Sequence, residues 1–372
     1  MNWEYVQPVR ISFGEGKVQT LPQEIKNFGC HRGILVTSRG FVKRGMASQI
    51  VAQSDGLIVA TFGEVSPNPD VKECDACAQI IRREQLDFVV AVGGGSVMDL
   101  AKAAATIALT DEPVTHYVGT GKPLPQEHLP LICVPTTAGT GSEITCVSVL
   151  TDHDRGVKAP MNSNGFYPRL AIVDPELTLS APQHLTACTG MDVLCHATEA
   201  YWSKHHQPIC DALAVHAARL VLDNLERAYD NGADRPARSA MCEASVTAGL
   251  AFTMPKTTSA HACSYPLTNR LGIAHGEACG LTISYFMRLN ALHGCQRVHD
   301  FARLLGFDDA YALADCIDGM KRHMHLLTDL KQFQLSGEPL ETIIQESKHP
   351  NLLNNPVEIT EQMLHDMYAS MI

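Results

Sequence analysis

The order of apolar and polar positions divides the chain into two parts with different periodicity. In residues 1–176, short continuous apolar runs alternate with stretches of helical periodicity. Continuous apolar runs are typical of strands in a parallel sheet that is covered on both faces. The runs are 33–37, 57–61, 87–92 and 131–134, and the helical stretches lie near 41–53, 70–85 and 96–109. This alternation predicts an α/β unit with a doubly wound parallel sheet, whose ligand site lies beyond the carboxyl ends of the strands.

The strand pattern stops around residues 171–182, and only helical periodicity follows. The expected helices are 183–204, 208–229, 236–254, 277–293, 296–304, 309–325, 337–347 and 359–371. A chain of 372 residues is also long enough for two domains. We therefore expect an α/β domain over 1–176 and an all-helical domain over 177–372.

Composition and charge exclude several classes of partner. The chain carries 29 basic and 40 acidic residues, a formal net charge of −11, which argues against a nucleic-acid partner. It contains no apolar run of 18 residues, and its first residues resemble no signal peptide. Its 13 cysteines follow no disulfide framework, which suits a reducing compartment. We expect a cytoplasmic protein that does not bind a membrane.

Two glycine-rich turns follow predicted strands in the first domain. One is the segment 92–99, with sequence VGGGSVMD, and the other is the segment 135–143, with sequence PTTAGTGSE. Each alone is equally well explained as a tight turn that needs glycine. Together they favour a nucleotide, because backbone N–H groups at a strand end and a helix start can approach a pyrophosphate. Neither turn has the GxGxxG or GxxxxGK[ST] pattern, so the usual dinucleotide and P-loop signatures are absent.

Candidate metal ligands lie in the second domain. Asp192 and His196 are four residues apart in one predicted helix, so both side chains project from the same face. Such a pair can form half of a divalent-metal site, although a lone pair of this kind is more often a local hydrogen bond. His261 and His275 lie in two further apolar segments flanked by small residues and are candidates for the other half.

At this point the motifs resemble a known family. The stretches VGGGSVMD, PTTAGTGSE, IVDPELT (172–178), GMDVLCHATEAY (190–201) and the block from AHACSYPL to IAHGEACGL (260–281) are similar to the group III, iron-containing alcohol dehydrogenases. The resemblance spans nearly the whole chain in the same order. It implies an N-terminal dinucleotide-binding domain and a helical metal-binding domain, an architecture shared with dehydroquinate synthase.

The resemblance also implies site residues and chemistry. A divalent ion, normally iron(II) and sometimes zinc, would be held by Asp192, His196, His261 and His275. The dinucleotide would lie on residues of the two turns and two nearby positions, namely Gly94, Gly95, Ser96, Asp99, Thr136, Thr137, Thr140, Asn68 and Lys158. The metal would polarise the oxygen of a small aldehyde or primary alcohol substrate, and the nicotinamide would carry the hydride. We also expect a homodimer or a higher homo-oligomer.

The sequence departs from the family pattern at two places. Tyr265 replaces a second histidine of the 260–281 block, and either takes part in proton relay through its hydroxyl or only shapes the pocket. We count Tyr265 and His275 as candidate catalytic residues. Ser38 and Arg39 stand where NAD-selective members carry an acidic residue that holds the ribose. The loss of a carboxylate and the gain of a guanidinium favour NADP(H), although NAD(H) would also fit beside Ser38.

The substrate and two other function classes stay open. The block 264–276 resembles the branch of the family that reduces phosphonoacetaldehyde, in which Arg270 or Lys158 would hold an anionic tail. Simple short-chain aldehydes fit equally well. The alternatives from other classes are a dehydroquinate synthase-like lyase that uses NAD transiently, and a non-catalytic nucleotide-binding metal scaffold. A lyase would show no net change in NAD(P)H absorbance during turnover.

Overall fold

A computed structural model describes residues 2–372, which divide into two compact units. The α/β unit comprises residues 6–137 and 141–178, and the helical unit comprises residues 2–5, 138–140 and 179–372. Residues 138–140, part of the second glycine-rich turn, are therefore grouped with the helices. The domain limits of 1–176 and 177–372 stay a prediction.

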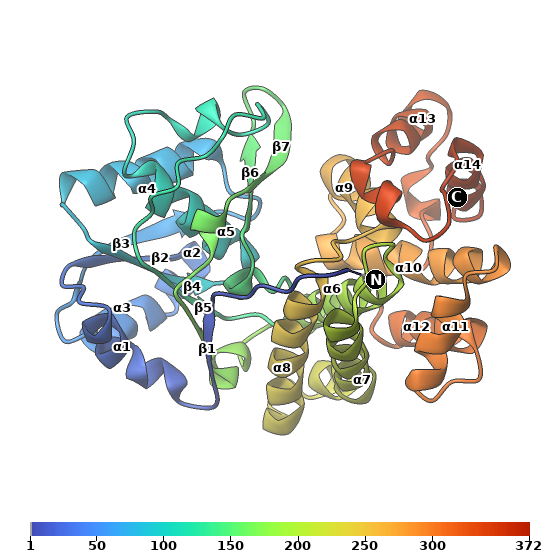
Figure 1. The fold of residues 1–372 in the computed structure, drawn as a ribbon, viewed down its shortest axis with the longest axis horizontal. Helices are drawn as coiled ribbons and strands as arrows, with labels where there is room; N and C mark the ends of the chain where they lie inside the picture. The colour runs from blue at the N-terminus through green and yellow to red at the C-terminus, as the bar shows by residue number, and fades with distance from the viewer. Residues whose placement is uncertain (1) are drawn as a thin grey trace. The chain divides into compact units, whose positions relative to one another are not determined.

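The α/β unit is built on a parallel sheet, as the apolar runs predict (Figure 1). Within residues 2–372 the sheet has six strands in the order β1-β8-β5-β4-β2-β3. They are β1 (Arg10–Phe13), β2 (Gly33–Ser38), β3 (Ile58–Val65), β4 (Phe88–Gly93), β5 (Leu131–Pro135) and β8 (Leu170–Val173). The helices of this unit are α1 (Leu21–Asn27), α2 (Arg39–Lys43), α3 (Met46–Ala52), α4 (Val71–Arg83) and α5 (Gly95–Ile107).

Alternating residues of the central strands enter two separate cores. In β4, Val89 and Ala91 pack in the core that contains α4 and α5, whereas Val90 and Val92 pack in the core that contains α1 and α3. Because both faces are buried, the strand reads as a continuous apolar run instead of an alternating one. This is why β2, β4 and β5 could be predicted.

Some elements of this unit were not predicted. The edge strand β1 and the strand β8 are only four residues long, and the hairpin of β6 (Val147–Asp152) and β7 (Val157–Asn162) forms a separate two-stranded antiparallel sheet. The single helix expected over 41–53 is two helices, because Gly45 adopts a positive φ of 74° between α2 and α3. Such a conformation ends a right-handed helix.

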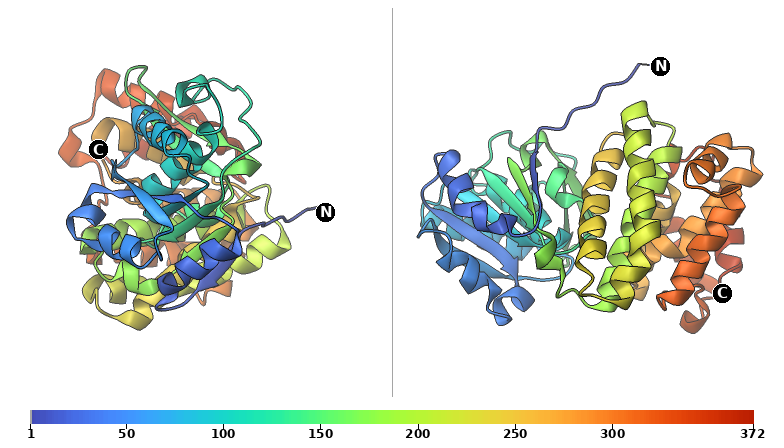
Figure 2. Two further views of the ribbon diagram at one scale, coloured as in Figure 1. Left: turned by 90° about the vertical axis from the view of Figure 1, so that its left-hand side faces the viewer. Right: turned by 90° about the horizontal axis from the view of Figure 1, so that it is seen from below.

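The second unit is helical, as predicted (Figure 2). Its helices are α6 (Gln183–Trp202), α7 (Pro208–Asp230), α8 (Arg235–Phe252), α9 (Ser259–Leu271), α10 (His275–Leu292), α11 (Gln296–Leu304), α12 (Ala310–His323), α13 (Gly337–Glu346) and α14 (Glu361–Ala369). Helix α6 is buried over most of its length, because α7, α8 and α10 pack around it. Its small residues make this possible: Gly190 directly faces Leu225 of α7, and a Cβ there would lie 2.2 Å from the leucine side chain.

Helix α9 is the element that periodicity missed. It contains Pro266, which removes one backbone donor and is unfavourable inside a helix. Its apolar positions also form no regular stripe, because the helix is buried on several sides. No helix among the described residues has both the length and the apolar character needed to cross a membrane.

Candidate metal centre and nucleotide-binding turns

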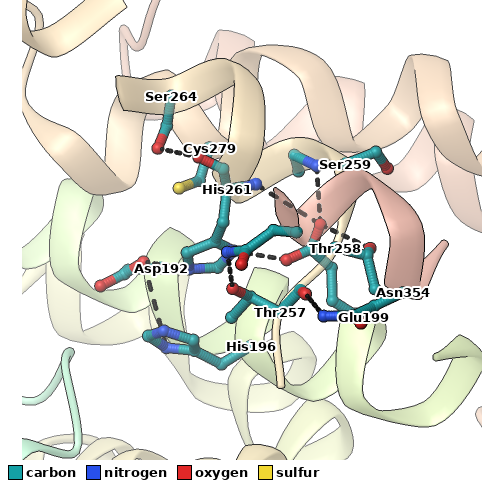
Figure 3. A network of polar contacts seen from close by, with 12 residues as sticks. Asp192, His196, Glu199, Thr257, Thr258, Ser259, His261, Ser264, Cys279 and Asn354 are labelled. Carbon is teal, nitrogen blue, oxygen red and sulfur yellow. Dashed lines mark hydrogen bonds and ion pairs between the residues drawn. The ribbon is translucent and has the colours of Figure 1, made fainter. Parts of the chain in front are cut away.

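The four predicted metal ligands come together in the helical unit. Asp192 and His196 lie on α6, His261 lies in the first turn of α9, and His275 is the first residue of α10. Atom Oδ1 of Asp192 lies 3.4 Å from Nε2 of His261, 3.8 Å from Nε2 of His275 and 4.0 Å from Nδ1 of His196. One carboxylate oxygen is thus surrounded by three imidazole nitrogens from three helices. Figure 3 shows Asp192 with His196 and His261.

These side chains fit a divalent cation. Within residues 2–372, Oδ1 of Asp192, Nδ1 of His196 and Nε2 of His261 are buried and have no hydrogen-bond partner. A buried polar atom without a partner costs about 1 to 3 kcal/mol, so three in one place are unexpected unless something else binds them. Oxygen and nitrogen donors at these positions are the ligands that iron(II) and zinc prefer.

The protonation states of Asp192 and His196 also suit a metal. Burial opposes ionisation of Asp192, but the neighbouring His196 and His275 hold the pKa of its carboxyl well below its usual range. Burial lowers the pKa of His196 to about 4. At neutral pH Asp192 and His196 therefore offer an ionised carboxylate and a neutral imidazole, the forms in which these groups bind metals.

Glu199 orients His261, although it follows His196 by three residues on α6. Its Oε2 accepts a short hydrogen bond from Nδ1 of His261. Its Oε1 accepts a hydrogen bond from the hydroxyl of Thr258 at 2.8 Å (Figure 3). The same oxygen accepts from the backbone N–H of Ala260 at 2.6 Å. A carboxylate that binds Nδ1–H fixes the imidazole tautomer, so that Nε2 of His261 faces Asp192 with a free lone pair.

Cys279 is a possible fifth ligand that sequence reasoning missed. Its Sγ lies 3.8 Å from Nε2 of His275, and its ligand atom lies within 4.8 Å of those of Asp192, His261 and His275. The signal in the sequence was its spacing, because Cys279 follows His275 by four residues on one helix.

The candidate catalytic residue Tyr265 lies beside this cluster. Its ring is parallel to that of His275 within 16°, with 6.1 Å between the ring centroids, and it also contacts the ring of His349 at 4.7 Å. Burial raises the pKa of the Tyr265 hydroxyl, which keeps it protonated at neutral pH.

In the α/β unit, the two glycine-rich turns lie next to each other. Gly93 at the end of β4 is in register with Pro135 at the end of β5, and the N–H of Thr136 donates to the carbonyl of Gly93 at 3.0 Å. Gly94 is the N-cap of α5, and no side chain of the described residues caps this helix. The N–H groups at the start of α5, in Gly95 and Ser96, are therefore available to an anion.

Side-chain hydrogen bonds connect the two turns. Both carboxylate oxygens of Asp99 are engaged, by the hydroxyl of Ser142 at 2.7 Å and by the N–H of Val149 at 2.9 Å. The buried Lys102 donates to the same Ser142 hydroxyl at 2.8 Å. Asp99 thus ties the first turn to the second. A Cβ on Gly94 would lie 3.1 Å from the Thr137 hydroxyl, so the two turns approach each other closely.

Of the other predicted cofactor residues, Ser38 and Arg39 lie at the carboxyl end of β2, whereas Lys158 lies in β7 of the separate hairpin. Ser38 ends β2, which is adjacent to β4, and its hydroxyl accepts from the N–H of Phe41 at 3.4 Å. The guanidinium of Arg39 pairs with Glu64 at 2.7 Å. Nζ of Lys158 donates to Asn68 at 3.1 Å. Thr140 belongs to the segment grouped with the helical unit.

Arg270, one of two candidates for an anionic substrate tail, already has a partner. Its Nε donates to Glu346 at 2.8 Å and its terminal nitrogen forms a second bond to the same carboxylate. Both side chains are largely exposed. An anion would have to displace Glu346 in order to bind Arg270.

Comparison with known proteins decides the family. Residues 8–175 match the model of iron-containing alcohol dehydrogenases, and residues 186–372 match the C-terminal model of the same family. The chain belongs to the iron-containing alcohol dehydrogenase family. This confirms the resemblance, the fold class and the assignment as an enzyme, and it favours the dehydrogenase over the lyase and scaffold alternatives.

Individual members of the family match over most or all of the chain. The long-chain-alcohol dehydrogenase 1 of Geobacillus thermodenitrificans is 33% identical, with 98% of this chain and 95% of that protein covered. The 1,3-propanediol dehydrogenase of Klebsiella pneumoniae is 35% identical over 82% of this chain and 79% of that protein. The crystal structure of sulfoacetaldehyde reductase from Bifidobacterium kashiwanohense in complex with NAD+ is 55% identical, covers 100% of this chain and 99% of its own, and has a TM-score of 0.97.

Proposed function

We propose that this iron-containing alcohol dehydrogenase reduces a short aldehyde with an anionic tail, for which sulfoacetaldehyde is the first candidate. The observation that carries the proposal is the cluster of Asp192, His196, His261 and His275. In the first three of these residues a buried polar atom lacks a partner unless a divalent cation binds it. The 55% identity to a sulfoacetaldehyde reductase supports the substrate. Phosphonoacetaldehyde is the second candidate, because residues 264–276 resemble that branch of the family.

When bound, the metal ion supplies Lewis-acid polarisation of the aldehyde oxygen, and the nicotinamide supplies the hydride. The protein contributes positioning and protonation. Glu199 holds His261 in the tautomer that leaves Nε2 free. The hydroxyl of Tyr265 is the proposed proton donor to the alkoxide that forms, because it is protonated at neutral pH and its ring packs on His275.

The turns after β4 and β5 are proposed to bind the dinucleotide. The open N-terminus of α5, at Gly95 and Ser96, would hold the pyrophosphate. Thr136 and Thr137 follow the adjacent strand and would line the same site. Asp99 would act through the second turn by holding Ser142 in place.

Selection between the two nicotinamide cofactors is proposed to rest on the end of β2. Ser38 offers a neutral hydroxyl and Arg39 a cation, which favours the 2′-phosphate of NADP(H). The carboxylate of Glu64 beside Arg39 opposes this preference. We retain NADP(H) as the favoured cofactor, with NAD(H) also accepted.

A substrate panel tests the proposed function. Iron(II)-reconstituted protein would be assayed with sulfoacetaldehyde, phosphonoacetaldehyde and the uncharged propionaldehyde, each with NADH and NADPH. We expect kcat/KM for at least one anionic aldehyde to exceed that for propionaldehyde by about tenfold or more, the effect of one charge-assisted contact. Equal values, or a preference for propionaldehyde, would refute the anionic substrate. Turnover of no aldehyde would refute the reductase.

A further inference from the structure

A second group of metal-binding side chains lies on the same two helices that carry Asp192 and His275. His184 and Cys188 are four residues apart on α6, and Glu277 lies in the first turn of α10. Nε2 of His184 lies 3.5 Å from Sγ of Cys188 and 3.6 Å from Oε2 of Glu277. The ligand atoms of all three residues lie within 4.8 Å of one another.

The two separations that involve His184 match a tetrahedral zinc site. With metal–sulfur and metal–nitrogen distances of about 2.3 and 2.0 Å, tetrahedral angles place sulfur and nitrogen ligands about 3.5 Å apart and nitrogen and oxygen ligands about 3.3 Å apart. The observed distances of 3.5 and 3.6 Å are within about 0.3 Å of these values. Three donors of the histidine, cysteine and carboxylate types leave a fourth position for water.

The cluster is held in place by backbone contacts. Oε1 of Glu277 accepts a hydrogen bond from the N–H of Leu327 at 2.9 Å, and this leaves Oε2 directed to His184. Gly276 packs against the backbone of α6, where a Cβ would lie only 2.0 Å from the carbonyl oxygen of Cys188. The position of Glu277 relative to Cys188 is therefore fixed before any ion binds, and a preorganised site binds with less loss of entropy.

Access to the cluster is provided by His184. Its side chain is 63% exposed, whereas that of Glu277 is only 8% exposed, and Cys188 is buried. An ion can therefore reach the buried thiol and carboxylate from the side of the exposed imidazole.

We propose that His184, Cys188 and Glu277 bind a second divalent ion of the zinc type, separate from the ion at Asp192, His196, His261 and His275. The thiol group favours zinc or cobalt over magnesium and calcium, which bind oxygen ligands. Bound there, the ion links α6 to α10, the helices that carry three of the four ligands of the first cluster. The proposal does not depend on the substrate or on the reductase activity.

Cobalt(II) distinguishes the two sites, because a cysteine ligand gives it an intense thiolate-to-metal charge-transfer band in the near ultraviolet. Metal-free protein would be loaded with cobalt(II), passed through gel filtration and analysed for metal per chain. We expect two ions in the parent and one in His184→Ala, a variant at an exposed position where folding is not at risk. We expect Cys188→Ala to lose one ion and the band. His205→Ala, which removes another exposed histidine, is the matched control and should retain two ions.

Two further variants separate this proposal from the proposed function. His261→Ala should lose the other ion and aldehyde reduction but retain the thiolate band. Cys279→Ala should retain the band if Cys188 is its source, and loss of the band in this variant would assign it to the first cluster instead. One cobalt ion per chain in the parent would overturn the second site, as would two ions in both His184→Ala and Cys188→Ala. Neither result would affect the assignment of the first cluster.

Discussion

Replacement of Glu199 by glutamine tests how the protein prepares His261 for a metal. Glu199 is fully buried, and its two oxygens have separate partners. Oε1 accepts from Thr258 and from the backbone N–H of Ala260, so an amide oxygen would have to remain at that position. The amide nitrogen of the glutamine would then face Nδ1 of His261. Because both groups would be donors, the imidazole would have to move its proton to Nε2, the atom that faces Asp192.

The expected loss follows from this change of tautomer. A protonated Nε2 has no lone pair for a metal, and binding must first restore the unfavourable tautomer. Removal of a partner of this kind typically lowers metal affinity 10- to 100-fold, which corresponds to about 1.4 to 2.7 kcal/mol. We expect Glu199→Gln to lose affinity in this range, and activity at limiting iron(II) to fall in proportion.

The assay is competition for iron(II) or zinc between the protein and a chromophoric chelator. Glu243→Gln is the matched control, because Glu243 contacts Nε2 of His216 at 2.9 Å in another histidine–carboxylate pair. This pair is about half-exposed and contains no residue of the metal cluster. Glu243→Gln should bind metal like the parent. An affinity for Glu199→Gln within about twofold of the parent would refute the reasoning, provided that circular dichroism shows the variant to be folded.

Three further outcomes are expected. The ratio of kcat/KM for NADPH to that for NADH should fall about tenfold in Ser38→Asp. The ratio should rise in Glu64→Gln, because Arg39 loses its carboxylate partner there. An unchanged ratio in both variants would show that the end of β2 does not select the cofactor. Tyr265→Phe should lower kcat by at least about tenfold without loss of bound metal, whereas an unchanged kcat would leave Tyr265 as a shape-determining residue only. Gly276→Ala should lower the free energy of unfolding in urea by more than about 2 kcal/mol, because the added Cβ would lie 2.0 Å from a backbone carbonyl oxygen. In the control Gly319→Ala the nearest atom would lie 4.0 Å from the added Cβ, and the free energy of unfolding should not fall in this way.

The sequence was most informative where burial or helix geometry alone determined the order of residues. The strands β2, β4 and β5 are buried on both faces and lie between turns, so their apolar runs predict a parallel sheet. The i, i+4 spacing of Asp192 and His196 predicts a shared helix face. That Asp192 and His196 form one site with His261 and His275, however, was implied by the family resemblance and not by periodicity.

The sequence was least informative where partners are distant in the chain. Glu199 precedes His261 by 62 residues, and no local pattern indicates that its carboxylate binds this imidazole instead of His196. The pairing of Arg270 with Glu346 is similarly distant, and so is that of Arg39 with Glu64 on the neighbouring strand. In the structure each of these two arginines is already paired with a carboxylate, whereas the sequence alone suggests that it is an unpaired cation.

Titration of iron(II) into metal-free protein, with aldehyde reduction followed in the same samples, tests the central claim most directly. The parent should be inactive without metal, and its rate of sulfoacetaldehyde-dependent NAD(P)H oxidation should rise with iron(II) until the cluster at Asp192 is filled. His261→Ala should stay inactive at every concentration, because it removes one ligand of this cluster. Full turnover by the metal-free parent, or by His261→Ala, would contradict the account.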